Sequence, residues 1–328
     1  MSGRREHDTE IFAKIEERIK NYPDLVKGFY RYMRSEDFTA MTTRGYIRSI
    51  IMYTNWVADT DGSYLDEDYV KTVKKQDIVS FMESTRYRTL ANGEVKENGA
   101  GVRATRLSAL LKFYDYLIDC EIITQNPCSR VKKPRDNKEL VVTYLTETEI
   151  NRMRRCIIAS KGMMRKRDLC ILTLGIRTGL RETALAEIDI SDIDFEAGEI
   201  KVVEKRRLAR TVYIGSDTIK IIKEWMADRA KILDGIETEA LFISTRRERM
   251  NQWSIWYMIK KYAKEAGIKK NITPHKMRAT CATTTYKKTG DIYLTASVLG
   301  HKNLANTKRY TNIDEAKIKD ITSKLDKI

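Results

Sequence analysis

The sequence LGHKNLANTKRYT, from Leu299 to Thr311, places a histidine and a tyrosine nine residues apart near the end of the chain. A single tyrosine in such a segment is most often a packing residue whose hydroxyl group is bonded to a neighbour. His301 is one of three histidines in 328 residues. The spacing of Tyr310 from the LGH triplet therefore makes this segment a candidate functional site.

Two more clusters of chemically active residues precede this segment. In TPHKMR, from Thr273 to Arg278, a proline opens a helix and presents a histidine and an arginine three residues apart, on one face. In TGLR, from Thr178 to Arg181, a glycine follows an apolar helical stretch and places an arginine at a turn. Each cluster alone is a weak signal, because charged side chains are common on protein surfaces. Lys205, at the tip of a predicted hairpin, would by itself be read as a solvated turn residue.

Taken together and in this order, the clusters resemble the tyrosine recombinases, the family of phage integrases, Xer resolvases and Cre. The matching elements are TGLR, a hairpin turn with Glu204-Lys205-Arg206, HKMR, and LGH followed by a tyrosine after nine residues. The resemblance implies strand cleavage and rejoining through a 3′-phosphotyrosyl intermediate and a Holliday junction, with chemistry like that of a type IB topoisomerase. It also implies that a scissile phosphate is surrounded by Arg181, Lys205, His275, Arg278, His301 and Tyr310.

The expected chemistry assigns a task to each of these residues. The two arginines can each give bidentate hydrogen bonds to the phosphate oxygens. A tyrosine hydroxyl has an ordinary pKa of about 10, so Tyr310 as nucleophile needs an acceptor, for which His275 is the better candidate. His301 would hydrogen-bond the phosphate. Lys205 would protonate the leaving 5′ oxygen as general acid.

One position departs from the family pattern. An acidic residue commonly stands three residues after the first arginine, and here that position is Ala184, with Glu182 and Glu187 nearby. The acid usually supports the pocket rather than taking part in the bond chemistry. We therefore expect altered surroundings of the pocket and retained activity.

The charge of the chain indicates a polyanionic partner. Sixty-one Lys and Arg residues against 46 Asp and Glu residues give a formal net charge of +15, which favours nucleic acid or an anionic membrane. The sequence has no apolar run near the roughly 20 residues that a spanning helix needs, and its charged start does not read as a signal peptide. We expect double-stranded DNA carrying recombination or attachment sites as the partner, no membrane, and a cytoplasmic, nucleoid-associated location.

No cofactor is expected. The sequence has no GxxxxGK[ST] phosphate loop and no carboxylate, Cys or His cluster suited to Mg²⁺ or Zn²⁺, and the chemistry conserves bond energy, so it needs neither metal nor ATP. The five cysteines form no CxxC spacing and are expected to be reduced thiols without a chemical role.

The predicted fold class is mainly α with a small β-hairpin or sheet, α+β overall. The first half is helical and resembles more loosely the family's SAM-like core-binding domain, which together with the catalytic domain would form a C-shaped clamp around DNA. Predicted helices are Thr43–Val57, Val70–Ser84 and Arg103–Ile118, with a loop at Leu90–Gly101. The second half should hold strands at Glu199–Val203 and Arg210–Ile214, and helices at Thr218–Ile232, Ser254–Ala266 and Arg278–Lys287.

Five segments are expected along the chain. Residues 1–34 would be an N-terminal extension, either a reduced arm-binding segment or simply helical, and 35–125 the core-binding domain. Residues 126–143 would form a basic linker, read either as a strap along a phosphate backbone or as a solvated loop. The catalytic domain would span 144–314, with a helix start marked by Thr146 and Glu149, and the tail helix 315–328. Candidate DNA-binding residues are Arg103, Arg106, Arg130, Lys132, Lys133 and Arg135.

Several alternatives stay open. The main expectation is a homotetrameric integrase of a mobile genetic element, with an accessory directionality factor in some settings. Within the family the alternative is a Xer-like resolvase of DNA dimers, and outside it a non-catalytic DNA-binding protein on the same fold or a topoisomerase without site preference. The tail either packs on its own domain or passes to a neighbouring subunit, as the family commonly does.

Overall fold

The structure is a computed structural model that describes residues 2–134, 142–204, 208–301, 303–308 and 310. The chain divides into two compact units, Met1–Glu139 and Leu140–Ile328. The described residues are mainly helical, with a two-stranded and a three-stranded antiparallel sheet, which confirms the predicted fold class; the clamp around DNA stays a prediction. No helix in these ranges is long and apolar enough to cross a membrane.

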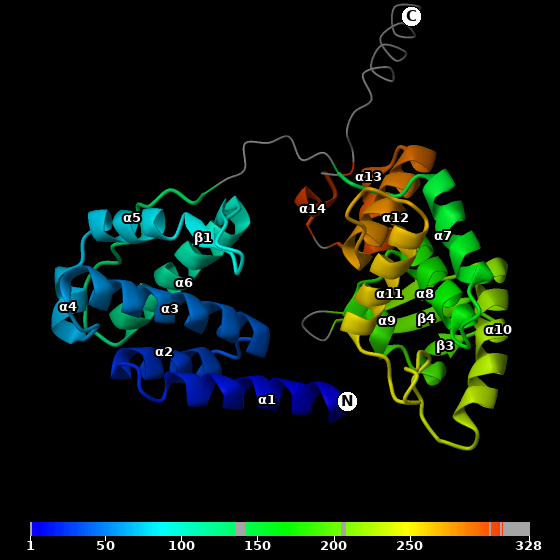
Figure 1. Cartoon of the computed structure of the whole chain (residues 1–328), viewed down its shortest axis with the longest axis horizontal. Coiled ribbons are helices and arrows are strands. Elements are labelled where there is room, and N and C mark those ends of the chain that lie inside the picture. The colour runs from blue at the N-terminus through cyan, green and yellow to red at the C-terminus, as the bar shows by residue number, and fades with distance from the viewer. Residues whose placement is uncertain (1, 135–141, 205–207, 302, 309, 311–328) are drawn as a thin grey trace, which may run out of the picture. The chain divides into compact units, whose positions relative to one another are not determined.

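The first unit is a bundle of helices with one short hairpin (Figure 1). Its elements are α1 (Ser2–Ile19), α2 (Asp24–Ser35), α3 (Ala40–Asp61), α4 (Glu67–Thr72), α5 (Lys75–Ser84), β1 (Tyr87–Thr89), β2 (Val95–Glu97) and α6 (Ala100–Asp119).

Aromatic side chains fill the core of this unit. The rings of Phe29 and Phe113 meet edge to face at 5.4 Å, a favourable geometry for aromatic pairs. The hydroxyl groups of Tyr53 and Tyr114 share a hydrogen bond of 2.7 Å, so these two buried polar groups satisfy each other. Ile11 of α1 belongs to the same core, and therefore α1 and α2 pack as part of the first unit.

Two local predictions for this unit were wrong. The single helix expected over residues 70–84 is two helices, because Val73 and Lys74 are extended and the Asp77 carboxylate accepts from the Lys74 N–H at 2.8 Å, which caps a new helix. The loop expected over residues 90–101 contains β2, which pairs with β1 through a turn closed by the Leu90 N–H to Glu94 carbonyl bond. Strands of three residues are too short to show a periodicity.

The second unit combines helices with a three-stranded sheet in the order β3-β4-β5. Its elements are α7 (Glu147–Ala159), α8 (Arg165–Thr178), α9 (Glu182–Glu187), the 3-10 helix η1 (Ile190–Asp192), β3 (Ile193–Asp194), β4 (Glu199–Glu204), β5 (Leu208–Tyr213), α10 (Ser216–Leu233), α11 (Gln252–Glu265), α12 (Pro274–Thr289), α13 (Ile292–Leu299) and α14 (Ala305–Lys308).

The local signals of this unit agree with its structure in most places. Thr146 and Glu149 form the predicted capping box at the start of α7. The predicted hairpin is present, but its strands are longer, because Glu204 pairs with Leu208. Glu204 and Leu208–Ala209, which were expected in the turn, therefore belong to the strands, and residues 205–207 lie outside the described residues.

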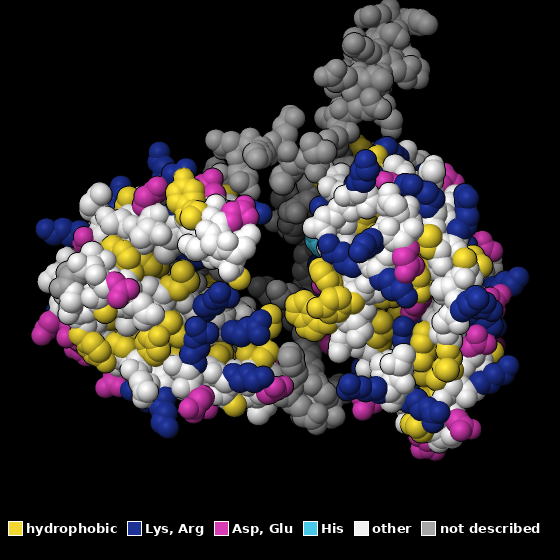
Figure 2. All heavy atoms as spheres, viewed as in Figure 1, with side chains coloured by type: hydrophobic (Ala, Val, Ile, Leu, Met, Phe, Trp, Pro, Cys, Tyr) yellow, Lys and Arg dark blue, Asp and Glu magenta, His cyan; other side chains and the backbone are white. Residues whose placement is uncertain are grey.

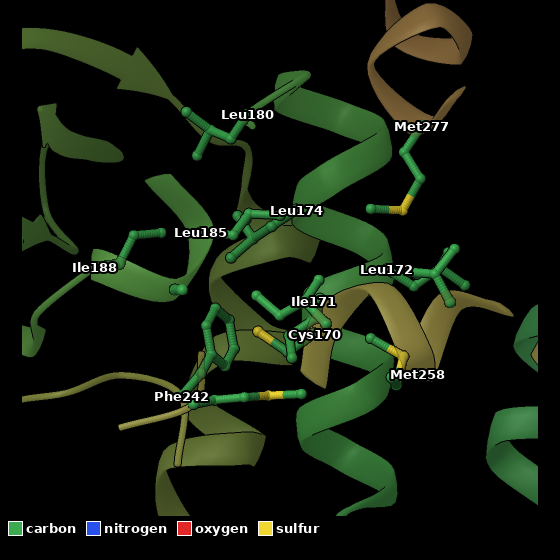
Figure 3. Packing of buried hydrophobic residues seen from close by; sticks show 14 of the residues in the cluster. Cys170, Ile171, Leu172, Leu174, Leu180, Leu185, Ile188, Phe242, Met258 and Met277 are labelled. Atoms are coloured by element: carbon green, nitrogen blue, oxygen red, sulfur yellow. The ribbon is translucent and has the colours of Figure 1, made fainter. Parts of the chain in front are cut away.

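Helix α8 runs through the core of the second unit and packs against α7, α10 and α12. Figure 3 shows Leu174 of α8 among side chains from other elements, with Met277 of α12, Met258 of α11 and Phe242 around the same helix. All four side chains are buried. Because α12 is packed directly on α8, the residues at the start of α12 are fixed relative to the end of α8, where TGLR lies.

Candidate active site

Arg278 connects three of the four motifs. Its side chain is 1% exposed, and its Nη1 and Nη2 atoms donate to the backbone carbonyls of Gly179 and Leu299, each at 2.6 Å. A guanidinium group can serve two acceptors at once because its donors form a rigid fork. HKMR is therefore joined to TGLR on one side and to LGH on the other.

The TGLR turn packs closely against Leu299 and Cys281. Gly179 ends α8 with φ +63, and a Cβ atom there would stand 2.6 Å from Leu299 Cδ2. Only glycine combines this left-handed backbone with such a close neighbour. Arg181 follows as the N-cap of α9, with extended backbone and a half-buried side chain.

The LGH turn has the same construction. Gly300 ends α13 with φ +66, and the His301 N–H donates to the Ala296 carbonyl at 2.9 Å, as expected where a helix closes on a left-handed glycine. The Arg210 side chain lies against Gly300, and its Nη1 donates to the Val298 carbonyl at 3.3 Å. Arg210 belongs to β5, so the hairpin is also tied to the LGH turn.

His301 and Tyr310 lie together. Their rings are nearly parallel, at an angle of 16° with centroids 6.4 Å apart. The Nδ1 atom of His301 shares a 2.8 Å hydrogen bond with the Thr307 hydroxyl, and the Tyr310 N–H donates to the Thr307 carbonyl at 2.9 Å. Thr307 is fully buried and thus fixes the ring of the histidine and the backbone of the tyrosine together.

Tyr310 is held by its own unit. Its side chain is 6% exposed and belongs to a small apolar cluster with Ala282 and Leu299. Cys281 of the same cluster has a thiol whose pKa burial raises to about 11, which suits a packing residue rather than a nucleophile.

The remaining predicted site residues lie as follows. His275 is the second residue of α12, exposed, and one turn before Arg278 on that helix. Lys205 lies outside the described residues, between the described strands β4 and β5. Ala184 is 4% exposed in the core of the second unit, so an acidic side chain at this position would be placed in an apolar environment.

The candidate DNA-binding residues fall into two groups. Arg103 and Arg106 lie on α6, where Arg103 is 3.6 Å from the Glu97 carboxylate and Arg106 donates to the Thr85 carbonyl. Three cations of the expected linker are exposed, namely Arg130, Lys132 and Lys133. Arg135 and the tail 315–328 lie outside the described residues.

Two residues beside the site, Arg210 and Thr307, have no role in the predictions from the sequence. Arg210 stands three residues after the run Lys205-Arg206-Arg207, and Thr307 stands between His301 and Tyr310. Because both residues lie close in sequence to the motifs, they could have been chosen as candidate site residues. Their hydrogen-bond partners, however, could not be predicted from sequence spacing.

Within the part of the chain that the structure describes, no group of three or more His, Cys, Asp or Glu residues could hold a metal ion. The site instead contains positively charged nitrogen donors. Burial raises the pKa of the Cys281 thiol, whereas the charges of Arg278 and Arg210 lower it, so both guanidinium groups lie near this residue. Such a set of donors favours a negatively charged substrate group, because fixed cations lower the energy of charge that develops beside them.

Comparison with known proteins identifies relatives of both units. The model of the phage integrase family matches residues 143–317. The tyrosine recombinase XerC of Caldanaerobacter subterraneus is 27% identical over 315 residues, which cover 92% of this chain and 87% of the relative. XerC of Actinobacillus pleuropneumoniae is 31% identical over 216 residues, covering 66% of this chain and 69% of the relative.

Solved structures share the fold. XerH recombinase bound to a palindromic difH substrate has a TM-score of 0.71 at 18% identity and covers 87% of this chain and 80% of its own. The integrase of transposon Tn1549 in complex with transposon right end DNA has a TM-score of 0.70 at 16% identity, covering 92% and 99%.

Proposed function

Since the chain belongs to the phage integrase family and is a tyrosine recombinase, an enzyme of DNA strand exchange, we propose that it recombines specific DNA sites with Tyr310 as its nucleophile. The observation that carries this proposal is the pair of hydrogen bonds from Arg278 to Gly179 and Leu299. These bonds gather TGLR, HKMR and LGH in one place, next to the stacked His301 and Tyr310.

We propose the following chemistry. The Tyr310 oxygen bonds to the scissile phosphorus while its hydroxyl proton passes to His275, and the bond from phosphorus to the 5′ oxygen breaks. That oxygen takes a proton from Lys205. Arg181, Arg278 and His301 bind the phosphate oxygens, where the negative charge grows. Attack by a new 5′ hydroxyl reverses these steps and releases the tyrosine, so no external energy source is needed.

The proposed partner is double-stranded DNA, on which the chain acts as a homotetramer. Support comes from the net charge of +15 and from family members solved on DNA, among them a lambda integrase tetramer bound to a Holliday junction.

We propose the integrase of a mobile genetic element as the biological role, with an accessory directionality factor where excision is favoured. This role is supported by the fold that the chain shares with residues 82–397 of the Tn1549 integrase, 99% of which it covers. A Xer-type resolvase of DNA dimers is the second candidate, favoured by the XerC relatives that cover both units.

These roles differ in what happens to the DNA around the gene. An integrase produces a circular form of its element. The junction of this circle can be amplified by PCR, and the PCR product should be absent when the gene is deleted. A resolvase converts plasmid dimers that carry its site into monomers. Detection of the first product supports the integrase, and detection of the second alone supports the resolvase.

The chemistry is tested with a nicked half-site. Cleavage releases a short fragment that carries the 5′ hydroxyl, and because this fragment diffuses away, rejoining is prevented and the covalent complex accumulates. We expect a protein-DNA adduct with the wild type and none with Tyr310→Phe, which should bind the half-site with nearly unchanged affinity. Tyr293→Phe is the matched control, because Tyr293 is 70% exposed on α13, and it should form the adduct normally. No adduct with the wild type would instead support a DNA-binding protein without catalytic activity.

A further inference from the structure

The segment that precedes α7 packs beside the proposed nucleophile. Tyr310 belongs to a small group of buried side chains, the Tyr310 cluster, whose other members are Ala279, Cys281, Ala282 and Leu299. The partly buried residues that pack against this cluster are Val142, Tyr144 and Val298. The Tyr310 cluster is separate from the larger apolar core of the second unit, so a few side chains determine how closely it is packed.

The backbone of this segment is fixed on α12. The Leu145 N–H donates to the Thr280 hydroxyl oxygen at 2.9 Å, and the same hydroxyl donates to the Lys276 carbonyl at 2.8 Å. Thr280 is fully buried and Leu145 is 1% exposed, so this pair of bonds is shielded from water. Helix α12 also carries His275 and Arg278, and the segment therefore has a defined position relative to two residues of the site.

Two lysines orient Tyr144. The Nζ atom of Lys287, on α12, donates to the Tyr144 hydroxyl at 3.0 Å, and the Nζ atom of Lys270 donates to the Tyr144 carbonyl at 3.2 Å. Both lysines are exposed, and Figure 2 shows Lys and Arg side chains on the surface where Figure 1 places α12. The polar groups of Tyr144 are therefore bonded to surface cations, while its ring packs against the Tyr310 cluster.

The position of the Tyr310 ring depends on the side chains packed around it. Tyr310 follows a helix of only four residues, α14, and the bond from its N–H to the Thr307 carbonyl fixes its backbone rather than its ring. Attack on phosphorus needs the reacting atoms about 3–3.5 Å apart and aligned, and a displacement of about 1 Å can reduce a rate about a hundredfold. Side chains that pack against the Tyr310 cluster can therefore change the rate of cleavage without contacting DNA.

We propose that Val142 and Tyr144 are positioning residues for the nucleophile, because they pack against the Tyr310 cluster and hold the ring of Tyr310 where its oxygen can attack the phosphate. The proposal rests on the proposed function, since that function makes Tyr310 the nucleophile. Val142 lies in the expected linker 126–143. The end of this segment thus supports catalysis, in addition to joining the two units.

The first test compares Val142→Ala and Tyr144→Ala with the wild type on the nicked half-site. At saturating protein, adduct formation should be about tenfold slower or more, because a displaced nucleophile reaches the geometry of attack less often. Half-site affinity should stay unchanged. Tyr144→Phe keeps the packed ring and should cleave faster than Tyr144→Ala. Wild-type rates of adduct formation in both alanine variants would overturn the proposal.

Ile150→Ala is the matched control for folding. Ile150 is also partly buried, but it packs against the larger core of the unit. Its melting temperature should fall at least as far as that of Val142→Ala, since more apolar atoms are removed. Its rate of adduct formation, measured where all variants are folded, should equal that of the wild type. An equally slow Ile150→Ala would attribute the effect to general loss of stability and overturn the proposal.

A substrate with sulfur in place of the bridging 5′ oxygen separates placement of the nucleophile from protonation of the leaving group. A thiolate leaves without a proton, which relieves the loss of a general acid but not the displacement of a nucleophile. Val142→Ala and Tyr144→Ala should therefore remain as slow, relative to the wild type, as they are on normal DNA. Recovery of the wild-type rate on the sulfur substrate would assign the segment to protonation of the leaving group and overturn the proposal.

Hydrogen exchange distinguishes the failure of this proposal from the failure of the proposed function. The Tyr310 amide donates to the Thr307 carbonyl at 2.9 Å, so its exchange rate reports how firmly Tyr310 is held. Exchange should be faster in Val142→Ala and Tyr144→Ala than in the wild type and Ile150→Ala. If the wild type forms no adduct, the proposed function fails, and this comparison still decides whether the two residues hold Tyr310. Equal exchange in all four proteins would overturn the proposal.

Discussion

The side chain of Arg210 lies so close to Gly300 that a Cβ atom added to Gly300 would stand 2.6 Å from the Arg210 Nε atom. Arg210 belongs to β5, the strand that follows Lys205 in the sequence, and Gly300 directly precedes His301. The contact therefore sets the position of the hairpin relative to the turn that carries the candidate phosphate-binding histidine.

Gly300→Ala should reduce adduct formation by about tenfold or more. The new methyl group would displace Arg210, and the left-handed backbone at φ +66 adds strain of roughly 1–2 kcal/mol for a residue other than glycine. Gly290→Ala is the matched control, because Gly290 has φ +68 but no atom within 4 Å of an added Cβ. It should lose similar stability and retain cleavage, measured with the nicked half-site. Equal cleavage defects in the two variants would show that the Arg210 contact has no effect of its own.

Arg278→Lys should lose both stability and cleavage. A single ammonium group cannot reach the carbonyls of both Gly179 and Leu299 in the same fork geometry, and an unsatisfied buried carbonyl costs about 1–3 kcal/mol. Arg229→Lys is the matched control. Arg229 is a buried residue of α10 that also donates to two backbone carbonyls, those of Ala240 and Thr238, and none of these residues belongs to the four motifs. It should be destabilised to a similar extent in thermal unfolding and still form the adduct. If Arg278→Lys formed the adduct at the wild-type rate, the proposed role of Arg278 in cleavage would be wrong.

Lys205→Ala should cleave a normal half-site poorly and regain speed on a substrate whose bridging 5′ oxygen is replaced by sulfur. A thiolate leaves without a proton, so a missing general acid matters less for that substrate. Single-turnover cleavage rates on the two substrates provide the measurement. Equal defects on both would assign Lys205 to phosphate binding.

Cleavage by the wild type should proceed in excess EDTA, and half-site affinity should fall steeply with salt. Release of counterions from about six or more phosphates predicts a log-log slope of roughly −5 or steeper. Filter binding and gel assays over a salt series check both expectations. A flat salt response or a loss of adduct with EDTA would contradict the proposed contacts or the metal-free chemistry, respectively.

Several features of the fold could be predicted because their signals are local. Thr146 and Glu149 mark a helix start within four residues, and Gly179 marks a helix end, because capping involves groups that are neighbours in the chain. The strands that flank Lys205 are rich in β-branched residues and are present in the structure. The hairpin β1–β2 escaped prediction, because two strands of three residues carry no periodic pattern.

The sequence by itself determined which residues are candidates for chemistry, because its short motifs resemble those of the tyrosine recombinases in order and spacing. That resemblance implies roles for six residues, namely Arg181, Lys205, His275, Arg278, His301 and Tyr310. Only the tertiary structure decided what holds them in place. Arg278 is 99 residues from Gly179 and 21 from Leu299 in the sequence. Arg210, which lies against Gly300, is 88 residues from its hydrogen-bond partner Val298. Such contacts arise from the packing of α12 on α8 and of β5 beside the end of α13. Side chains so distant in sequence come together only when several elements bury their apolar faces at once, and no local spacing encodes that arrangement.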